Sequence, residues 1–163
     1  MQPNTLDPMV LKAAQAVRKE VEIWAHRLSD PEDCMIDPDS LTGCCAIASY
    51  LLHRTLTHLG IKSTLTMGRF FVNGRPSWDD DANEHCNHCW VVVDGQIVDV
   101  TASQFGCPDP VFVGPIDDDR YYVVRSGAAA RHNILRDWNT QSPVCYPNSM
   151  SSILKQVSKE VRV

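Results

Sequence analysis

Residues 88–101 carry the strongest structural pattern in this chain, and they predict a tight β-hairpin. They read His-Cys-Trp-Val-Val-Val-Asp-Gly-Gln-Ile-Val-Asp-Val-Thr. Asp94-Gly95 between two apolar runs is typical of a two-residue turn, because a type I′ turn needs positive φ at both central residues. The predicted cross-strand pairs are then Val93 with Gln96, Val92 with Ile97, Val91 with Val98 and Trp90 with Asp99.

Side chains alternate along a strand, so this register predicts which residues share a face of the hairpin. One face should carry His88, Trp90, Val92, Ile97, Asp99 and Thr101. His88 and Asp99 become diagonal neighbours about 7–8 Å apart, a gap that the two side chains can bridge. An aspartate inside an apolar strand is costly unless it has a partner. The sequence therefore predicts a carboxylate that orients an imidazole, which is half of a nucleophilic triad.

The bulk properties favour one ordinary globular domain over 1–163, with a core at about 41–125 and helical extensions at both ends. Apolar residues make up 44% of the 163 residues and charged residues 21%. The net charge of -5 argues against nucleic acid or an anionic membrane surface as the partner. The patterns leave the oligomeric state open.

Location and redox state are also predicted. No apolar run approaches the ~20 residues that span a bilayer, and no signal peptide is visible. We therefore expect a cytoplasmic protein, with export by another route still open. The seven cysteines are odd in number and irregularly spaced, which favours reduced thiols over a disulfide framework.

The remaining periodicity predicts an α+β fold with an antiparallel sheet packed by helices. Helices are expected at 8–29, after the capping pair Asp7-Pro8, and at 45–59, ending at Gly60. The other expected elements are a strand over 61–72 with a turn at Asn73-Gly74, short strands at 111–113 and 121–124, and helices at 128–138 and 149–161.

The start of the second predicted helix supplies a candidate nucleophile. Gly43-Cys44-Cys45 immediately precedes its apolar stripe. A thiol at a helix start lies near unpaired backbone N–H groups and the positive end of the helix dipole, and both favour the reactive thiolate. Gly43 lets the backbone approach a substrate closely, and the first N–H groups of the helix can stabilise an oxyanion.

These residues together resemble a known superfamily. Gly43-Cys44-Cys45 followed by a helix is similar to the Gly-x-Cys nucleophile motif of papain-like and transglutaminase-like proteins. The two strands of the hairpin resemble the strands on which that superfamily carries its histidine and aspartate, and the order Cys, His, Asp is the same. The resemblance covers residues 41–106, less than half of the chain.

The resemblance implies Cys45 as nucleophile, His88 as base and Asp99 as the group that orients it. It also implies a core in which the cysteine begins a helix packed on an antiparallel sheet, with no cofactor. Two departures are visible. Val100 stands where many members have proline, and no upstream counterpart of papain's oxyanion glutamine is present.

Three further residues are predicted to support the site. Gln104, downstream of the motif aspartate, is expected near it. Trp90 shares the face of the histidine and the aspartate, and should shield their hydrogen bond from water. Cys44 is the alternative nucleophile if the helix begins one residue earlier.

The implied function is a cysteine-dependent hydrolase or acyltransferase that acts on an amide bond through a thioester. A water acceptor gives a peptidase, amidase or glutamine deamidase, and an amine acceptor gives a transglutaminase-like reaction. We expect a protein or peptide-like substrate, with segments 30–42 and 75–87 framing the cleft. A bacterial or phage protein, or a delivered effector, fits the size and the resemblance.

Two alternatives remain. His85, Cys86, His88 and Cys89 have zinc-ligand spacings, to which Cys44 and Cys45 could add ligands. Against a metal, Cys89 falls on the hairpin face opposite His88, and no second well-spaced cysteine pair is present. A non-catalytic protein-binding module on the same fold is the other alternative. The acidic runs 79–81 and 117–119 are expected to be solvated loops, with His26 and His132 at the surface.

Overall fold

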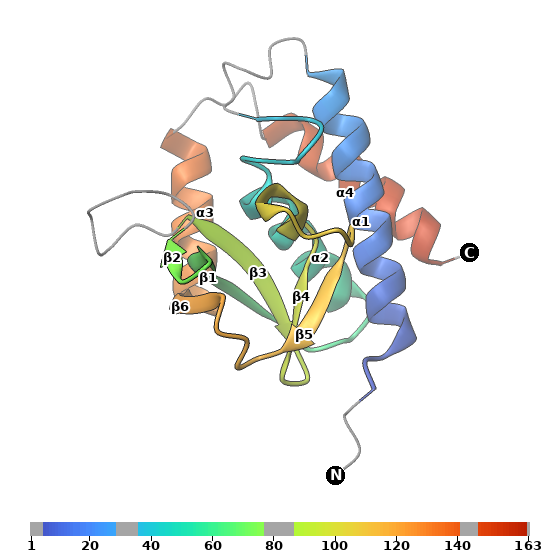
Figure 1. Ribbon diagram of the computed structural model, residues 1–163. Helices are drawn as coiled ribbons and strands as arrows, with labels where there is room; N and C mark the ends of the chain where they lie inside the picture. Colours follow the sequence, from blue (N-terminus) through green and yellow to red (C-terminus); the bar gives the residue numbers. More distant parts are fainter. Residues whose placement is uncertain (1–4, 29–35, 77–86, 141–146, 163) are drawn as a thin grey trace.

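The computed structural model describes residues 5–28, 36–76, 87–140 and 147–162, and its fold is α+β (Figure 1). Four helices and a sheet make up this part of the chain. The helices are α1 (Pro8–Arg27), α2 (Cys45–His58), α3 (Ala128–Thr140) and α4 (Pro147–Val161). The strands are β1 (Thr64–Val72), β2 (Arg75–Pro76), β3 (His88–Val93), β4 (Gln96–Asp99), β5 (Phe112–Pro115) and β6 (Tyr121–Ser126), and a 3₁₀ turn η1 (Ala102–Phe105) follows β4.

The sheet is antiparallel throughout. Its strands follow the order β2-β1-β3-β4-β5, and β6 also pairs with β1. Helix α2 packs against β3 and β1, while α1 and α4 contact each other and α2. Figure 1 shows α1 and α4 on the side of α2 away from α3, which instead packs on β1 and β6. The predicted α+β class, an antiparallel sheet packed by helices, is confirmed.

The hairpin of β3 and β4 has the predicted register. Val93 pairs with Gln96, Val92 with Ile97 and Val91 with Val98. Both turn residues have positive φ, 50° at Asp94 and 74° at Gly95, as a type I′ turn requires. The turn chemistry therefore set which side chains share each face.

The two faces of the hairpin contribute to two separate apolar clusters. Cys89, Val91, Val93, Val98 and Val100 pack in the larger cluster, with the buried sides of α1, α2 and α4. Trp90 and Ile97 belong to a smaller cluster with Phe70 and Tyr121. This separation confirms the predicted alternation, and it puts aromatic rings rather than aliphatic chains around the face that carries His88 and Asp99.

The predicted elements are present with small shifts at their ends. Asp7 caps α1 by accepting a 2.9 Å hydrogen bond from Met9 N, with Pro8 as the first helical residue, but the helix ends at Arg27 rather than 29. β1 begins at Thr64 rather than 61, because Gly60, with a φ of 73°, ends the preceding helical segment and residues 61–63 form a connection without regular structure. The two-residue β2 and the turn η1 were not predicted.

Several predictions concern residues outside the described ranges. These are the acidic run 79–81, His85, Cys86 and large parts of the two predicted cleft segments, 30–42 and 75–87. His26 and His132 are exposed as predicted, and so are Asp117 and Asp119. Within the described ranges, no helix is long and apolar enough to cross a membrane.

Candidate functional site

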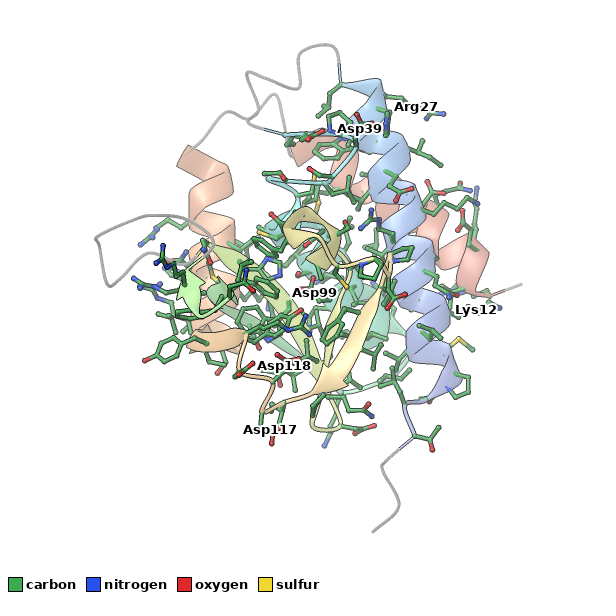
Figure 2. The ribbon with its side chains drawn as sticks, in the orientation of Figure 1. Lys12, Arg27, Asp39, Asp99, Asp117 and Asp118 are labelled. Atoms are coloured by element: carbon green, nitrogen blue, oxygen red, sulfur yellow. The ribbon has the colours of Figure 1, made fainter. Side chains whose placement is uncertain are left out.

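His88 and Asp99 form a direct pair in the interior of the protein. His88 Nε2 lies 2.6 Å from Asp99 Oδ2, and the exposed fractions of the two residues are 1% and 0%. Figure 2 shows Asp99 well inside the molecule, whereas Asp117 lies at its lower edge. A carboxylate can only accept, so Nε2 carries the proton in this pair. The diagonal pairing predicted from the hairpin register is confirmed.

Three further hydrogen bonds satisfy the buried Asp99 carboxylate. The Tyr121 hydroxyl donates to Oδ2 at 2.8 Å, and Thr101 donates to Oδ1 through its backbone N at 2.9 Å and its hydroxyl at 3.4 Å. Burial alone would raise the pKa of Asp99, but the positive charge of His88 and these donors outweigh it and lower that pKa. The carboxylate therefore stays charged without contact with water.

Aromatic rings enclose the imidazole. Trp90 stacks on His88 with ring centroids 5.7 Å apart, and Phe105 and Phe70 meet it edge-on at 4.8 and 5.7 Å. Trp90 is 1% exposed, so it covers this side of the His88–Asp99 pair as predicted. Exclusion of water strengthens the attraction between the imidazolium and the carboxylate, because the local dielectric is low.

Cys45 is the first residue of α2, and its side chain is hydrogen-bonded to the His88 ring and to Cys89. The Cys89 hydrogen bonds, from thiol and backbone, and the His88 charge act against burial and hold the pKa of the Cys45 thiol well below its ordinary range. Burial opposes the charged form of His88, but Asp99 and the Cys45 thiolate outweigh it and raise the pKa of His88 to about 9. The charges favour a thiolate–imidazolium pair.

The environment of Cys44, unlike that of Cys45, favours the neutral thiol. Cys44 is the residue before α2, its side chain is fully buried in the larger apolar cluster, and burial raises the pKa of its thiol to about 12. The helix does not begin one residue earlier, so the condition under which Cys44 would replace Cys45 is not met. The thiol that contacts the His88 ring is that of Cys45.

The loop before α2 has a strained backbone that directs the chain into the helix. Leu41 and Gly43 have φ values of 61° and 86°, in the left-handed region. The Cys44 N–H donates to the Leu41 carbonyl at 3.0 Å, and the Ala48 N–H makes the first helical bond, back to Cys44. The N–H groups at 45–47 therefore precede the helical ladder, where no intrahelical acceptor exists for them.

Gln104 lies beside the imidazole, as predicted. Its side-chain nitrogen is 3.4 Å from His88 Nδ1 and 3.3 Å from Thr101 Oγ1. Nε2 of the ring is engaged by Asp99, so Nδ1 is the nitrogen left to face Cys45 and Gln104. The turn η1, which was not predicted, is the element that brings Gln104 to this position.

Arg18 of α1 holds the segment that follows Asp99, and we did not predict this role. Its NH1 group donates to Ser103 Oγ at 2.7 Å, to the Val100 carbonyl at 3.0 Å and to the Pro110 carbonyl at 3.4 Å, and Nε pairs with Glu22 at 2.6 Å. Arg18 is 8% exposed. A buried arginine inside an amphipathic helix is unusual enough to be a signal in itself.

Ser103 links this segment to the loop before the nucleophile. Its hydroxyl donates to the Ser40 carbonyl at 3.2 Å, and Ser40 in turn contacts Thr42 and Asp37. Helix α1 thus links two segments through Arg18 and Ser103. One is the turn η1, which carries Gln104, and the other is the loop that leads into Cys45. The partners in these contacts are more than 60 residues apart in the sequence, so local sequence patterns do not predict them.

Cys89 lies on the hairpin face opposite His88, as the register predicted. Cys89 is buried and faces α2, and its thiol contacts Cys45 there. The alternation of side chains along a strand predicts which face a residue is on. It does not predict which residue of another element packs against that face.

Comparison of the chain with protein-family models, with curated proteins and with solved structures gave no match. No group of three or more His, Cys, Asp or Glu side chains suited to a metal ion occurs among the residues that the structure describes. Cys86, on which the zinc alternative depends, lies outside them.

Tyr121 provides a first test of how the buried carboxylate is stabilised. Tyr121→Phe removes the hydroxyl that donates to Asp99 and keeps the ring. We expect the free energy of unfolding to fall by about 1.5–3 kcal/mol, the range for a hydrogen bond to a charged group. Urea denaturation measures it. The matched control is Tyr122→Phe, at a residue 60% exposed, which should change stability by less than about 0.5 kcal/mol. Equal effects of the two variants would contradict the assignment.

Proposed function

We propose that this protein is a cysteine-dependent hydrolase or acyltransferase that cleaves an amide or related acyl bond through a thioester. The observation that carries the proposal is the continuous chain of contacts from Cys45 through His88 to Asp99. A thiol nucleophile, a base in contact with it and a third group that orients the base make up the constellation that acyl transfer by cysteine requires. The papain/transglutaminase-like core implied by the sequence belongs to the same proposal.

The chemistry follows from the charges of the three groups. The Cys45 thiolate attacks the substrate carbonyl carbon, and the carbonyl oxygen becomes negative. The His88 imidazolium then donates its Nδ1 proton to the leaving amine as the carbon–nitrogen bond breaks, which leaves a thioester on Cys45. Neutral His88 next accepts a proton from water or an incoming amine, whose attack releases the acid or the new amide. Asp99 holds the ring and stabilises its charged form throughout.

The start of α2 supports the same step. The N–H groups at 45–47 precede the helical ladder and lie at the positive end of the helix. An oxygen that becomes negative beside Cys45 is stabilised by donors already in place. Gly43 is exposed and carries no side chain that would block a substrate from this side.

An activated ester tests the proposal without a known substrate. With p-nitrophenyl acetate, we expect the acetyl group to be found on Cys45 as a hydroxylamine-sensitive thioester, and p-nitrophenolate release to continue past one equivalent. Added methylamine accelerates release and yields N-methylacetamide if the enzyme is an acyltransferase, whereas water suffices for a hydrolase. Acetylation that is spread evenly over several cysteines and lysines, without preference for Cys45, would refute the nucleophile.

The pH dependence of thiol labelling gives a second prediction. The pKa of Cys45 is held low, and the pKa of His88 is raised to about 9. Labelling of Cys45 by iodoacetamide should therefore already be fast below neutral pH, and should persist above pH 9 because the thiolate remains when His88 loses its proton. His88→Ala should move the rise in rate toward the ordinary cysteine pKa of about 8.5. Labelling rates over a buffer series, with peptide mapping, measure both profiles. If wild type and His88→Ala gave the same pH profile, the Cys45–His88 pairing would be contradicted.

The chemistry suits a protein or peptide-like substrate, because such a substrate contains amide bonds whose carbonyl carbon the thiolate can attack. A zinc-binding or non-catalytic module remains the alternative to be tested. Zinc analysis of the purified protein discriminates, because stoichiometric metal lost in a Cys86→Ser variant would favour the zinc site over the thioester mechanism.

A further inference from the structure

Cys89 is a second thiol inside the candidate site that the proposed acyl chemistry does not use. It is the second residue of β3, it is 3% exposed, and its thiol and backbone N–H are both hydrogen-bonded to Cys45. Both cysteines are free thiols. The nucleophile thus has an unoxidised thiol as a direct neighbour, on the side away from the His88–Asp99 pair.

The two cysteine residues differ in exposure as well as in position. Cys45 is partly exposed at the start of α2, whereas Cys89 is covered by the larger apolar cluster. The Cys45 thiol has the thiolate character that reaction with a peroxide needs, and Cys89 donates its thiol hydrogen to it. Cys45 is therefore the cysteine of the pair that a small oxidant attacks first.

We propose that the Cys45–Cys89 pair is a reversible oxidation site, in which Cys89 resolves the oxidised nucleophile as an intramolecular disulfide. Hydrogen peroxide, or another peroxide, is the oxidant. The Cys45 thiolate attacks one peroxide oxygen, the O–O bond breaks, and Cys45 becomes a sulfenic acid while hydroxide leaves. The Cys89 sulfur then attacks Cys45 Sγ, an S–S bond forms and the S–O bond breaks. The Cys89 proton and the departing hydroxyl leave together as water.

The contact geometry favours this partner over the other described cysteines. A disulfide requires the two sulfurs to close to about 2.05 Å. Cys89 is the cysteine whose thiol contacts that of Cys45, where α2 packs on β3. Cys44 is adjacent in the chain, but its side chain is fully buried in the apolar cluster, and burial keeps it in the thiol form. Cys107 lies beyond η1, and neither it nor Cys44 is hydrogen-bonded to the Cys45 thiol.

The disulfide would switch the site off and protect it. A disulfide-bonded Cys45 cannot attack a carbonyl, and it gives up its charge interaction with His88. The same bond prevents a second and third oxidation of Cys45 to the sulfinic and sulfonic acids, which thiol reductants do not reverse. The inference rests on the reactive Cys45 thiolate of the proposed function, but its test needs no acyl substrate.

The experiment compares full-length protein with two single variants. Fully reduced protein is treated with a small excess of hydrogen peroxide, free thiols are blocked with N-ethylmaleimide, and the mass is measured before and after dithiothreitol. We expect wild type to lose two hydrogens, to yield a linked peptide pair that contains Cys45 and Cys89, and to regain iodoacetamide labelling of Cys45 after reduction. The matched control Cys107→Ser should behave as wild type does.

Cys89→Ser should instead gain two oxygens on Cys45 and recover little labelling after reduction. Cys89→Ala gives a second comparison, and labelling of the reduced variants shows whether the site has folded. A Cys45 disulfide to any other cysteine, or equal recovery in wild type and Cys89→Ser, would overturn the proposal. The two proposals can fail separately. Acetylation of Cys45 without a Cys45–Cys89 disulfide would contradict only the oxidation site. A disulfide without acetyl turnover would contradict only the acyl chemistry.

Discussion

Replacement of Cys45 by alanine is expected to abolish rapid iodoacetamide labelling at neutral pH and to lower turnover of p-nitrophenyl acetate by at least about 10³-fold, because the attacking sulfur is gone. Binding at the start of α2 and the remaining donors leave only a small residual rate. Peptide mapping after brief alkylation and continuous absorbance of p-nitrophenolate measure the two effects.

The control for this variant is the neighbouring residue. Cys44→Ala removes a thiol of the same size one position earlier, where burial raises the pKa to about 12. We expect it to keep rapid labelling and turnover, with some loss of stability from the small cavity that it leaves. Loss of both activities in Cys44→Ala, with Cys45→Ala still active, would reverse the assignment of the nucleophile.

Asp99→Asn should have the second-largest effect, a fall in acetyl turnover of about 10²–10⁴-fold. The oxygen of the new amide must accept from the Thr101 N–H, so its NH₂ group faces His88 Nε2. An NH₂ group donates, and the ring then carries its proton on Nδ1, which faces Cys45. A protonated Nδ1 on a neutral ring cannot accept the thiol proton, and the imidazolium has lost its counter-charge.

Asp94→Asn is the matched control, with the same chemical change in the same hairpin. Asp94 has a φ of 50° in the type I′ turn, a conformation that asparagine adopts readily. We expect wild-type turnover from it. The measurements are turnover, the pH profile of Cys45 labelling and urea denaturation. A merely structural role for Asp99 would lower stability and leave the pH profile of Cys45 labelling unchanged, and this result would contradict our assignment.

The hairpin shows how far local patterns reach. Its turn, register and faces were predicted from residues 88–101, and the His88–Asp99 pair followed from them. The position of Cys45 was also predictable as a helix start, because the turn-forming Gly43 precedes an apolar stripe. The contact between Cys45 and His88 was an expectation from the superfamily resemblance, and the packing of α2 on β3 is what creates it.

Other parts of the site depend on contacts that no local pattern encodes. Tyr121 donates to Asp99 across 22 positions and Arg18 reaches Ser103 across 85, so neither partner could be identified from its own surroundings. Cys89 was assigned correctly to its face of the strand, but its neighbour on that face was not foreseen. Gln104 was expected near the site, and the unpredicted turn η1 explains how it arrives there.

The sequence by itself determined most of the elements, the hairpin register and the face that His88 and Asp99 share, because turn chemistry, helix capping and side-chain alternation act over a few residues. Only the tertiary structure decided which thiol contacts the imidazole and what stabilises the charges. Burial, hydrogen bonding and charge act between elements in space: they raise the pKa of Cys44, lower that of Cys45, and enclose His88 among aromatic rings. Proton affinity is a property of that environment rather than of the residue, so it emerges only when the elements pack.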